Sequence, residues 1–286
     1  SSITIATVAD PAANYDFGIF KNTPGAAIAI EGGGPEFEFF GTINNAPPSI
    51  ANRDIIQMAN LDGTLRPLGS RTISISGPGL TPLQDGGNGV FIDSVNNYES
   101  VEIIGLTLRG TSANGILLEN SNNSGFAFAN TTITGSTGEA VLLNGLGGTS
   151  SVTFTSLDVA LNNAGTVGIA YQNSTNTGLV QFTDTSIRGA TSQGVLLNNN
   201  TGTTTFDNLA INLTSNTAQG FNANNAGTVY TTGSNTITNA SATLAAIYIE
   251  QTTDLTGPSG EGLNFLSVNS GNAQGRGQIA GLTLLT

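Results

Sequence analysis

Carboxylates are the acid and base groups that this sequence offers for catalysis. The 286-residue chain contains no His and no Cys, which removes the commonest general base, the thiolate nucleophile and the disulfide bond. Paired Asp or Glu residues hydrolyse glycosides when their carboxyl groups lie about 5–10 Å apart. Asp158, Asp184 and Asp207 are the best candidate group, with Arg109 and Arg188 as candidate basic partners. Whether these residues meet depends on the elements that carry them.

A short motif recurs seven times: a small residue, an apolar triplet, and then Asp, Glu, Asn or Gln. The small residues follow one another at intervals of 26, 25, 28, 26, 26 and 26, and they are Gly89, Gly115, Ala140, Gly168, Gly194, Gly220 and Ala246. Three apolar residues make a short strand and continue into no helical period. A constant period of this size is typical of stacked repeat units that bury their apolar faces against one another.

A second pattern follows each triplet after about a dozen residues, as in Phe128, Asn130 and Ile133. Its middle residue is Gly or a residue that tolerates a bend, so each repeat predicts strand, loop, strand, bend and strand. Stacked coils of this kind form a solenoid of parallel strands with equivalent side chains one above another. We therefore predict an interior aromatic stack of Phe128, Phe154, Phe182 and Phe206.

A polar position lies two residues past each triplet and is most often Asn. Asn tolerates left-handed backbone geometry, and stacked copies can hydrogen-bond through their amides. With this column the pattern resembles the right-handed parallel β-helix family, which includes pectate-lyase-like enzymes, phage tailspikes and autotransporter or adhesin passengers. The resemblance covers residues 71–286 and implies an all-β, right-handed parallel β-helix with about 26 residues and three strands per coil. It also implies a structural ladder at Asn120, Asn173, Asn199 and Asn225.

The candidate catalytic residues fit this architecture poorly. The three aspartates occupy different positions of the repeat, and Arg109 and Arg188 share a position but lie three coils apart. In the resembling enzymes, grouped aspartates work with a nearby histidine, or a basic residue works beside calcium-binding acids. We expect no catalytic residue here, and the charges are interpreted as solvated.

Calcium is the one cofactor that the sequence leaves open. Residues 86–91 begin like a calcium-binding nonapeptide, but Phe91 stands where that motif needs Asp, and the motif occurs once. Loose Ca²⁺ binding through Asp93, Glu119 and neighbouring carbonyls is the alternative to binding no cofactor.

Charge and composition restrict the partners. The net charge is −12, which argues against a nucleic-acid backbone as partner. The sequence has no apolar run long enough to span a membrane. The chain begins at Ser1 without signal-peptide features, and we interpret it as a mature or excised portion of a longer protein. The lack of Cys, common in bacterial surface solenoids, favours an extracellular or cell-surface location.

The first strand of each coil predicts an exposed apolar face. Alternation sends the outer members of each triplet inward and the middle member outward. The opposite parity exposes residues such as Val90 and Ile92 instead, so one lateral face is apolar under either assignment. Soluble monomers seldom leave such a stripe bare. We expect a partner or cap interface at Phe91, Leu117, Leu142, Leu196 and Tyr248.

The two ends differ from the repeat. Residues 1–70 lack it, and we predict an N-terminal cap or assembly segment that covers the stripe unless a second subunit does so. Residues 71–286 form the solenoid, with an open or extended C-terminal end whose unpaired edge invites pairing. The predicted function is that of a non-enzymatic structural or adhesive protein with a surface, glycan or self-association partner. The alternatives are a subunit that stacks head to tail into an extracellular filament or sheath, and a polysaccharide-binding or carbohydrate-active enzyme.

Overall fold

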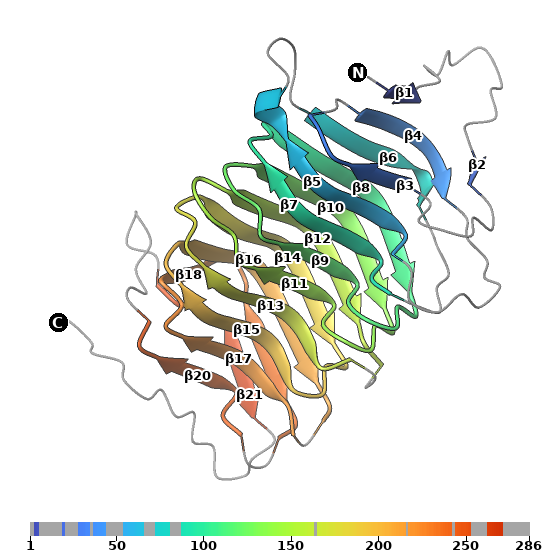
Figure 1. Cartoon of the computed structure of the whole chain (residues 1–286). Coiled ribbons are helices and arrows are strands. Elements are labelled where there is room, and N and C mark those ends of the chain that lie inside the picture. Colours follow the sequence, from blue (N-terminus) through green and yellow to red (C-terminus); the bar gives the residue numbers. More distant parts are fainter. Residues whose placement is uncertain are drawn as a thin grey trace.

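The computed structural model describes residues 3–5, 19–20, 28–34, 37–43, 54–65, 72–80, 87–162, 165–215, 217–241, 244–252 and 262–270. These residues form two β-sheets that run the length of a stack of coils (Figure 1). The only helical turn among them is η1 (Gly63–Leu65). Neighbouring strands pair in parallel, and successive coils lie about 26 residues apart, so the chain is an all-β parallel solenoid as predicted.

The larger sheet, here called sheet A, has twelve strands. They are β1 (Ile3–Ile5), β2 (Ile19–Phe20), β4 (Phe37–Ile43), β6 (Thr72–Leu80), β8 (Ser100–Arg109), β10 (Gly125–Thr134), β12 (Ser151–Ala160), β14 (Leu179–Arg188), β16 (Thr203–Leu213), β18 (Thr228–Thr232), β19 (Thr236–Asn239) and β21 (Ser267–Ser270).

The second sheet, sheet B, has nine strands in the order in which the coils stack. They are β3 (Ile28–Glu31), β5 (Ile56–Asp62), β7 (Val90–Asn96), β9 (Ile116–Glu119), β11 (Val141–Asn144), β13 (Val167–Ser174), β15 (Gln193–Asn200), β17 (Gln219–Asn224) and β20 (Ile247–Glu250). Each coil of the repeat therefore places one triplet strand in sheet B and one long strand in sheet A.

The long strands of sheet A bend at the position that the second pattern marks. Asn130, Ser156, Asp184 and Asn208 have positive φ, and the strand pairing skips each of them. In the coil of β18 and β19 the two limbs are separate strands, with Gly233 at positive φ between them. Each coil thus contains three extended segments, two of them limbs of one bent strand.

The predicted aromatic stack lies in the interior. Phe128, Phe154, Phe182 and Phe206 are fully buried, and their ring centroids are 4.7, 5.1 and 5.1 Å apart with interplanar angles of 8–10°. The ring of Phe221 packs edge-on against Phe206, with an interplanar angle of 78°. Each ring contributes the burial of a large apolar side chain, about 1.5–3 kcal/mol, and the parallel register of the strands dictates the stacking.

The expected boundary at residue 70 does not divide the sheets. β3 and β5 continue sheet B beyond β7 in register, with Ile28 opposite Ile56 and Ile56 opposite Val90. β4 continues sheet A beyond β6. These described strands lengthen the stack and do not cover the triplet face.

Glycine is required at the start of the triplet strands because neighbouring coils and the two sheets approach closely there. A Cβ placed on Gly194 would lie 2.6 Å from the carbonyl oxygen of Gly220 and 2.7 Å from Cγ2 of Ile211. Gly115, Gly168 and Gly220 meet an Ile at the same position of their own coils. In the coil that has Ala140 in this column, the aliphatic residue in register with Ile133 and Ile187 is the shorter Val159. Four glycines of the column therefore face Ile and Gly89 faces Leu108, while Ala140 lies in the coil with the shorter Val159.

A buried tyrosine interrupts the inner column of sheet B. Tyr171 stands in register with Leu143 and Leu197 and is fully buried. Its hydroxyl donates to Oδ1 of Asn176, whose amide donates to the carbonyl oxygens of Ser150 at 2.8 Å and Gly178 at 3.1 Å. Burial raises the pKa of Tyr171 from 10.0 to about 12, and the hydrogen bonds oppose the rise. The phenol thus ties an interior position to a turn between coils.

The size matching in the glycine column predicts a coupled pair of substitutions. Gly194→Ala is expected to lower the free energy of unfolding by about 1–3 kcal/mol, because the added methyl overpacks the contact with Ile211. Ile211→Val, which copies the Ala140 and Val159 combination, is expected to recover part of that loss because the shorter side chain can withdraw. Chemical denaturation of both single variants and the double variant measures the coupling. Strictly additive losses would contradict the size-matching explanation.

Tyr171 predicts how stability changes at high pH. A raised phenol pKa means that the folded state holds the proton more tightly, so its contribution is complete below pH 10 and is lost as the pH rises toward 12. Tyr171→Phe is expected to cost about 1 kcal/mol at pH 7, because Asn176 loses a donor. The variant should also lose less stability than the parent between pH 10 and pH 12. Equal losses in urea denaturation across that range would show that Tyr171 does not titrate as described.

Candidate functional site

The outward face of sheet B is the candidate site, and it consists of two side-chain columns. Burial alternates along the triplet strands, so the outer members of each triplet point inward and the middle member and the following polar residue point outward. Because the strands are in register, the outward residues align from coil to coil. We call the two columns the apolar column and the polar column.

The apolar column contains every residue that the sequence placed at the partner or cap interface. In register order it is Ala29, Gln57, Phe91, Leu117, Leu142, Ala170, Leu196, Asn222 and Tyr248. Phe91, Leu117, Leu142, Leu196 and Tyr248 are half-buried, because each is flanked by its neighbours in the stack. Ala170 is buried, and Asn222 interrupts the apolar run. The stripe is therefore continuous from Phe91 to Leu196 but presents less free surface than isolated side chains would.

The polar column runs beside it, two residues further along each strand. In register order it is Glu31, Ala59, Asp93, Glu119, Asn144, Gln172, Asn198, Asn224 and Glu250. Four members are carboxylates and four are amides, so the column has acidic ends and a neutral middle. Asp93 and Glu119 were expected as loose calcium ligands, but the column was not predicted, because the fourth residue of each motif had no assigned role.

Two carboxylates stack directly upon one another in the polar column. Asp93 and Glu119 are register partners in neighbouring coils. Burial and then the charge of Asp93 raise the pKa of Glu119, while a hydrogen bond with Asn144 lowers it. Oδ1 of Asp93 accepts from Nδ2 of Asn120 at 3.0 Å and from the hydroxyl of Ser94 at 3.1 Å. Like charges opposite one another on adjacent strands destabilise a sheet.

The two columns are joined at β20. The hydroxyl of Tyr248 donates to Oε2 of Glu250 at 2.5 Å, and this bond to a carboxylate raises the pKa of Tyr248. The contact fixes the phenol ring along the face.

The predicted asparagine positions all adopt left-handed geometry, with φ between 48° and 54° at Asn120, Asn173, Asn199 and Asn225. One hydrogen bond between side-chain amides connects two of them, from Nδ2 of Asn225 to Oδ1 of Asn199 at 3.2 Å. Asn173 donates to Asn144, and Gly145 occupies the position between Asn120 and Asn173. The ladder is therefore a set of turn residues with mixed partners.

In three coils the residue after this left-handed position is a buried polar side chain that was not predicted from the sequence. Ser121 and Ser174 accept the backbone N–H groups of Val95 and Leu146, at 3.1 and 3.0 Å, and Asn200 accepts that of Ser174 at 3.2 Å. All three side chains are buried. They directly follow the left-handed position, but Val95 and Leu146 hold the same position in other coils, so the repeat gave no uniform signal. The three polar side chains satisfy backbone donors that the turn leaves over.

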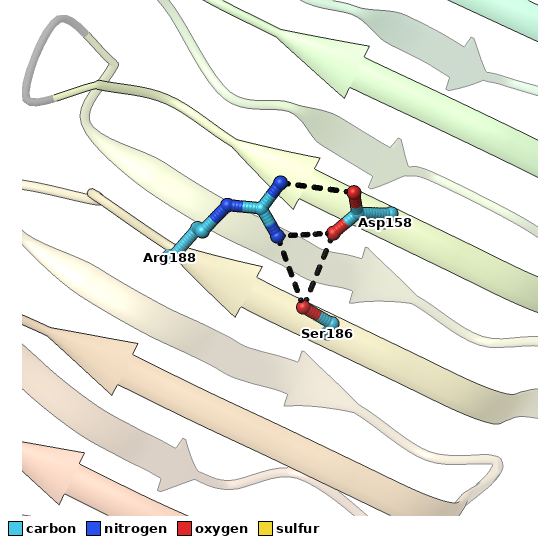
Figure 2. Close-up of polar contacts among 3 residues, drawn as sticks. All are labelled: Asp158, Ser186 and Arg188. Atoms are coloured by element: carbon cyan, nitrogen blue, oxygen red, sulfur yellow. Dashed lines mark hydrogen bonds and ion pairs between the residues drawn. The ribbon is translucent and has the colours of Figure 1, made fainter.

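The candidate catalytic aspartates are dispersed over sheet A. Arg188 donates two hydrogen bonds to the carboxylate of Asp158, from Nη1 to Oδ1 at 2.5 Å and from Nη2 to Oδ2 at 2.9 Å (Figure 2). The hydroxyl of Ser186 donates to Oδ1 of the same carboxylate at 3.1 Å. Asp184 is on the bend and accepts from Asn208 at 3.0 Å. Arg109 is in register with Thr134, which is in register with Ala160 and so with Arg188, as the spacing predicted. The carboxylate of Asp158 is thereby held by a cross-strand ion pair.

Searches for similar proteins find no matching family model, curated protein or solved structure. The described residues contain no group of three or more Asp, Glu, His or Cys side chains placed to hold a metal ion. No helix in the described part of the chain is long and apolar enough to cross a membrane. The fold and its columns define the class of the protein, a parallel β-solenoid built from repeats of about 26 residues.

The stacked carboxylates predict a stabilising substitution. Because the pKa of Glu119 is raised, its ionised form costs stability at pH 7, and this cost disappears as the pH falls below the ordinary value of 4.5. Glu119→Gln is expected to raise the free energy of unfolding at pH 7 by roughly 0.5 kcal/mol, a figure that allows for solvent screening. Asn144→Asp, which extends the acidic run, should lower it. Thermal unfolding at pH 7 and pH 3 checks both, and a Glu119→Gln variant that is less stable than the parent at pH 7 would contradict the argument.

Proposed function

We propose that this protein is a non-enzymatic structural and adhesive solenoid of the extracellular space or cell surface, which adheres through the outward face of sheet B. The observation that carries the proposal is the apolar column, whose five positions from Phe91 to Leu196 are all apolar and, apart from the buried Ala170, half-buried. Half-buried aliphatic side chains on a regular sheet form a shallow apolar strip that gains free energy when a partner covers it.

The stack suits this role mechanically. Nine strands in sheet B give eight inter-strand intervals, which at about 4.8 Å each make a face roughly 38 Å long. The aromatic stack and the interior aliphatic columns hold this face on a continuous apolar core. Binding energy is then distributed over many equivalent contacts, as an adhesive surface requires.

Binding is favoured over hydrolysis by the state of the candidate acids. A glycosidase needs a carboxylic acid and a carboxylate that both face the substrate. Asp158 is instead held by Arg188 and Ser186, and Asp184 is a bend residue bound by Asn208. These contacts give Asp158 and Asp184 a structural role, because each one connects neighbouring strands of sheet A.

The proposal predicts that adhesion depends on the apolar column. Leu117→Ser, Leu142→Ser and Leu196→Ser, combined in one variant, are expected to lower the work of detachment by about 3 kcal/mol per bound molecule or more, since each Leu contributes apolar area worth about 1 kcal/mol or above. Force spectroscopy would pull beads coated with the protein from mucin-type glycan, collagen and bare apolar polymer surfaces.

The matched control combines Thr153→Ser, Thr155→Ser and Thr183→Ser, at positions that project from the outer face of sheet A. This control should adhere like the parent. Equal detachment work for the parent and the leucine variant on every surface would refute adhesion through sheet B. Circular dichroism and thermal unfolding of each variant verify that the coil stack is intact.

A further inference from the structure

The charge on sheet B has one sign. Its nine strands carry five carboxylates, Glu31, Asp62, Asp93, Glu119 and Glu250, and no Lys or Arg. The strands of sheet A carry both signs, with Arg109 and Arg188 among them. Sheet B therefore presents an apolar column whose neighbouring column is acidic at both ends.

The fold does not need these carboxylates. Gln172, Asn198 and Asn224 occupy the same column and stack there as neutral amides. An amide pair in place of Asp93 and Glu119 would remove the repulsion between register partners. Residues that work against local stability are expected where a function selects them.

A second copy of the same face is a poor partner. Two sheet B faces brought together would oppose acidic columns with no Lys or Arg on either set of strands to neutralise them. Like charges placed against one another in an interface cost several kcal/mol and exclude that pairing. A partner of the opposite charge avoids this cost and offsets the carboxylates.

We infer that the outward face of sheet B binds a cationic amphipathic polypeptide, whose aliphatic side chains cover the apolar column while Lys or Arg side chains lie along the polar column. This inference rests on the proposed function, in which the outward face of sheet B is the binding surface. Aliphatic residues form most of the strip, so the apolar part of the partner is aliphatic or aromatic side chains. The Asp93 and Glu119 pair is where a cationic side chain gains most, because one cation offsets two stacked charges.

The test uses the full chain and a fluorescent peptide of Leu and Lys with amphipathic helical spacing. Fluorescence anisotropy at low and high salt would measure its binding to the parent and to the double variant Asp93→Asn, Glu119→Gln. We expect the double variant to bind about tenfold more weakly at low salt, since two close charge pairs are lost. A matched peptide with Glu in place of Lys should not bind.

Asp207→Asn, on the outer face of sheet A, is the control and should change the affinity by less than about twofold. The loss of repulsion at Glu119 is expected to stabilise the double variant, and thermal unfolding verifies that weaker binding does not come from unfolding. Equal binding of the Lys and Glu peptides, or no loss in the double variant, would overturn the inference.

Two further outcomes assign the face to other partners and overturn the inference as well. One is a chitosan oligosaccharide that binds as tightly as the peptide and is unaffected by the leucine variant. The other is sedimentation showing a dimer of the chain that the leucine variant dissociates. If the leucine variant loses adhesion while the double carboxylate variant keeps peptide binding unchanged, the proposed adhesive function stands and the cationic partner does not.

Discussion

Parallel, in-register stacking of the coils governs which side chains this protein can place at each position. It places every residue directly above its equivalent in the next coil, at the spacing of adjacent strands. A residue type that interacts well with itself therefore stabilises a whole column, and one that repels itself destabilises it. The four stacked phenylalanines and the inward aliphatic columns of sheet B are apolar examples of the first kind.

The same constraint explains the places where the columns vary. Gly gives way to Ala at position 140 in the coil where the column of Ile133 and Ile187 has the shorter Val159. Tyr171 is accepted among leucines because Asn176 in the adjoining turn accepts a hydrogen bond from its hydroxyl. A departure from the column is tolerated when a neighbour in the same coil or the next compensates for its size or polarity.

Most of the fold could be predicted because the repeat carries its own register. Once the anchors were aligned, the inner and outer members of β9 and β11, the bends at Asn130 and Asp184 and the aromatic stack followed from strand alternation and turn chemistry. The early coils could not be predicted in this way. Ile28–Glu31 has the same pattern of an apolar triplet and an acid as Ile116–Glu119, but Ile28 and Ile56 are 28 residues apart and Ile56 and Val90 are 34 apart. The loops between these strands differ in length, so the sequence spacing does not reveal the register, although the strands themselves are paired in register.

The candidate site was predicted in part for a related reason. Period-two alternation identified the apolar column, because outward position depends on the strand alone. The polar column and its charge conflict depend on which residues are register partners across coils, as Asp93 and Glu119 are. In sheet A, the charge of Asp158 is neutralised within the sheet, because Arg188 from the next coil forms an ion pair with it and Ser186 donates a hydrogen bond to it. Sheet B offers its stacked carboxylates hydrogen bonds from Asn120 and Ser94 but no cation from its own strands. Stacking alone accounts for the neutral members of that face, and the acidic pair is the feature that calls for a charge from outside the sheet.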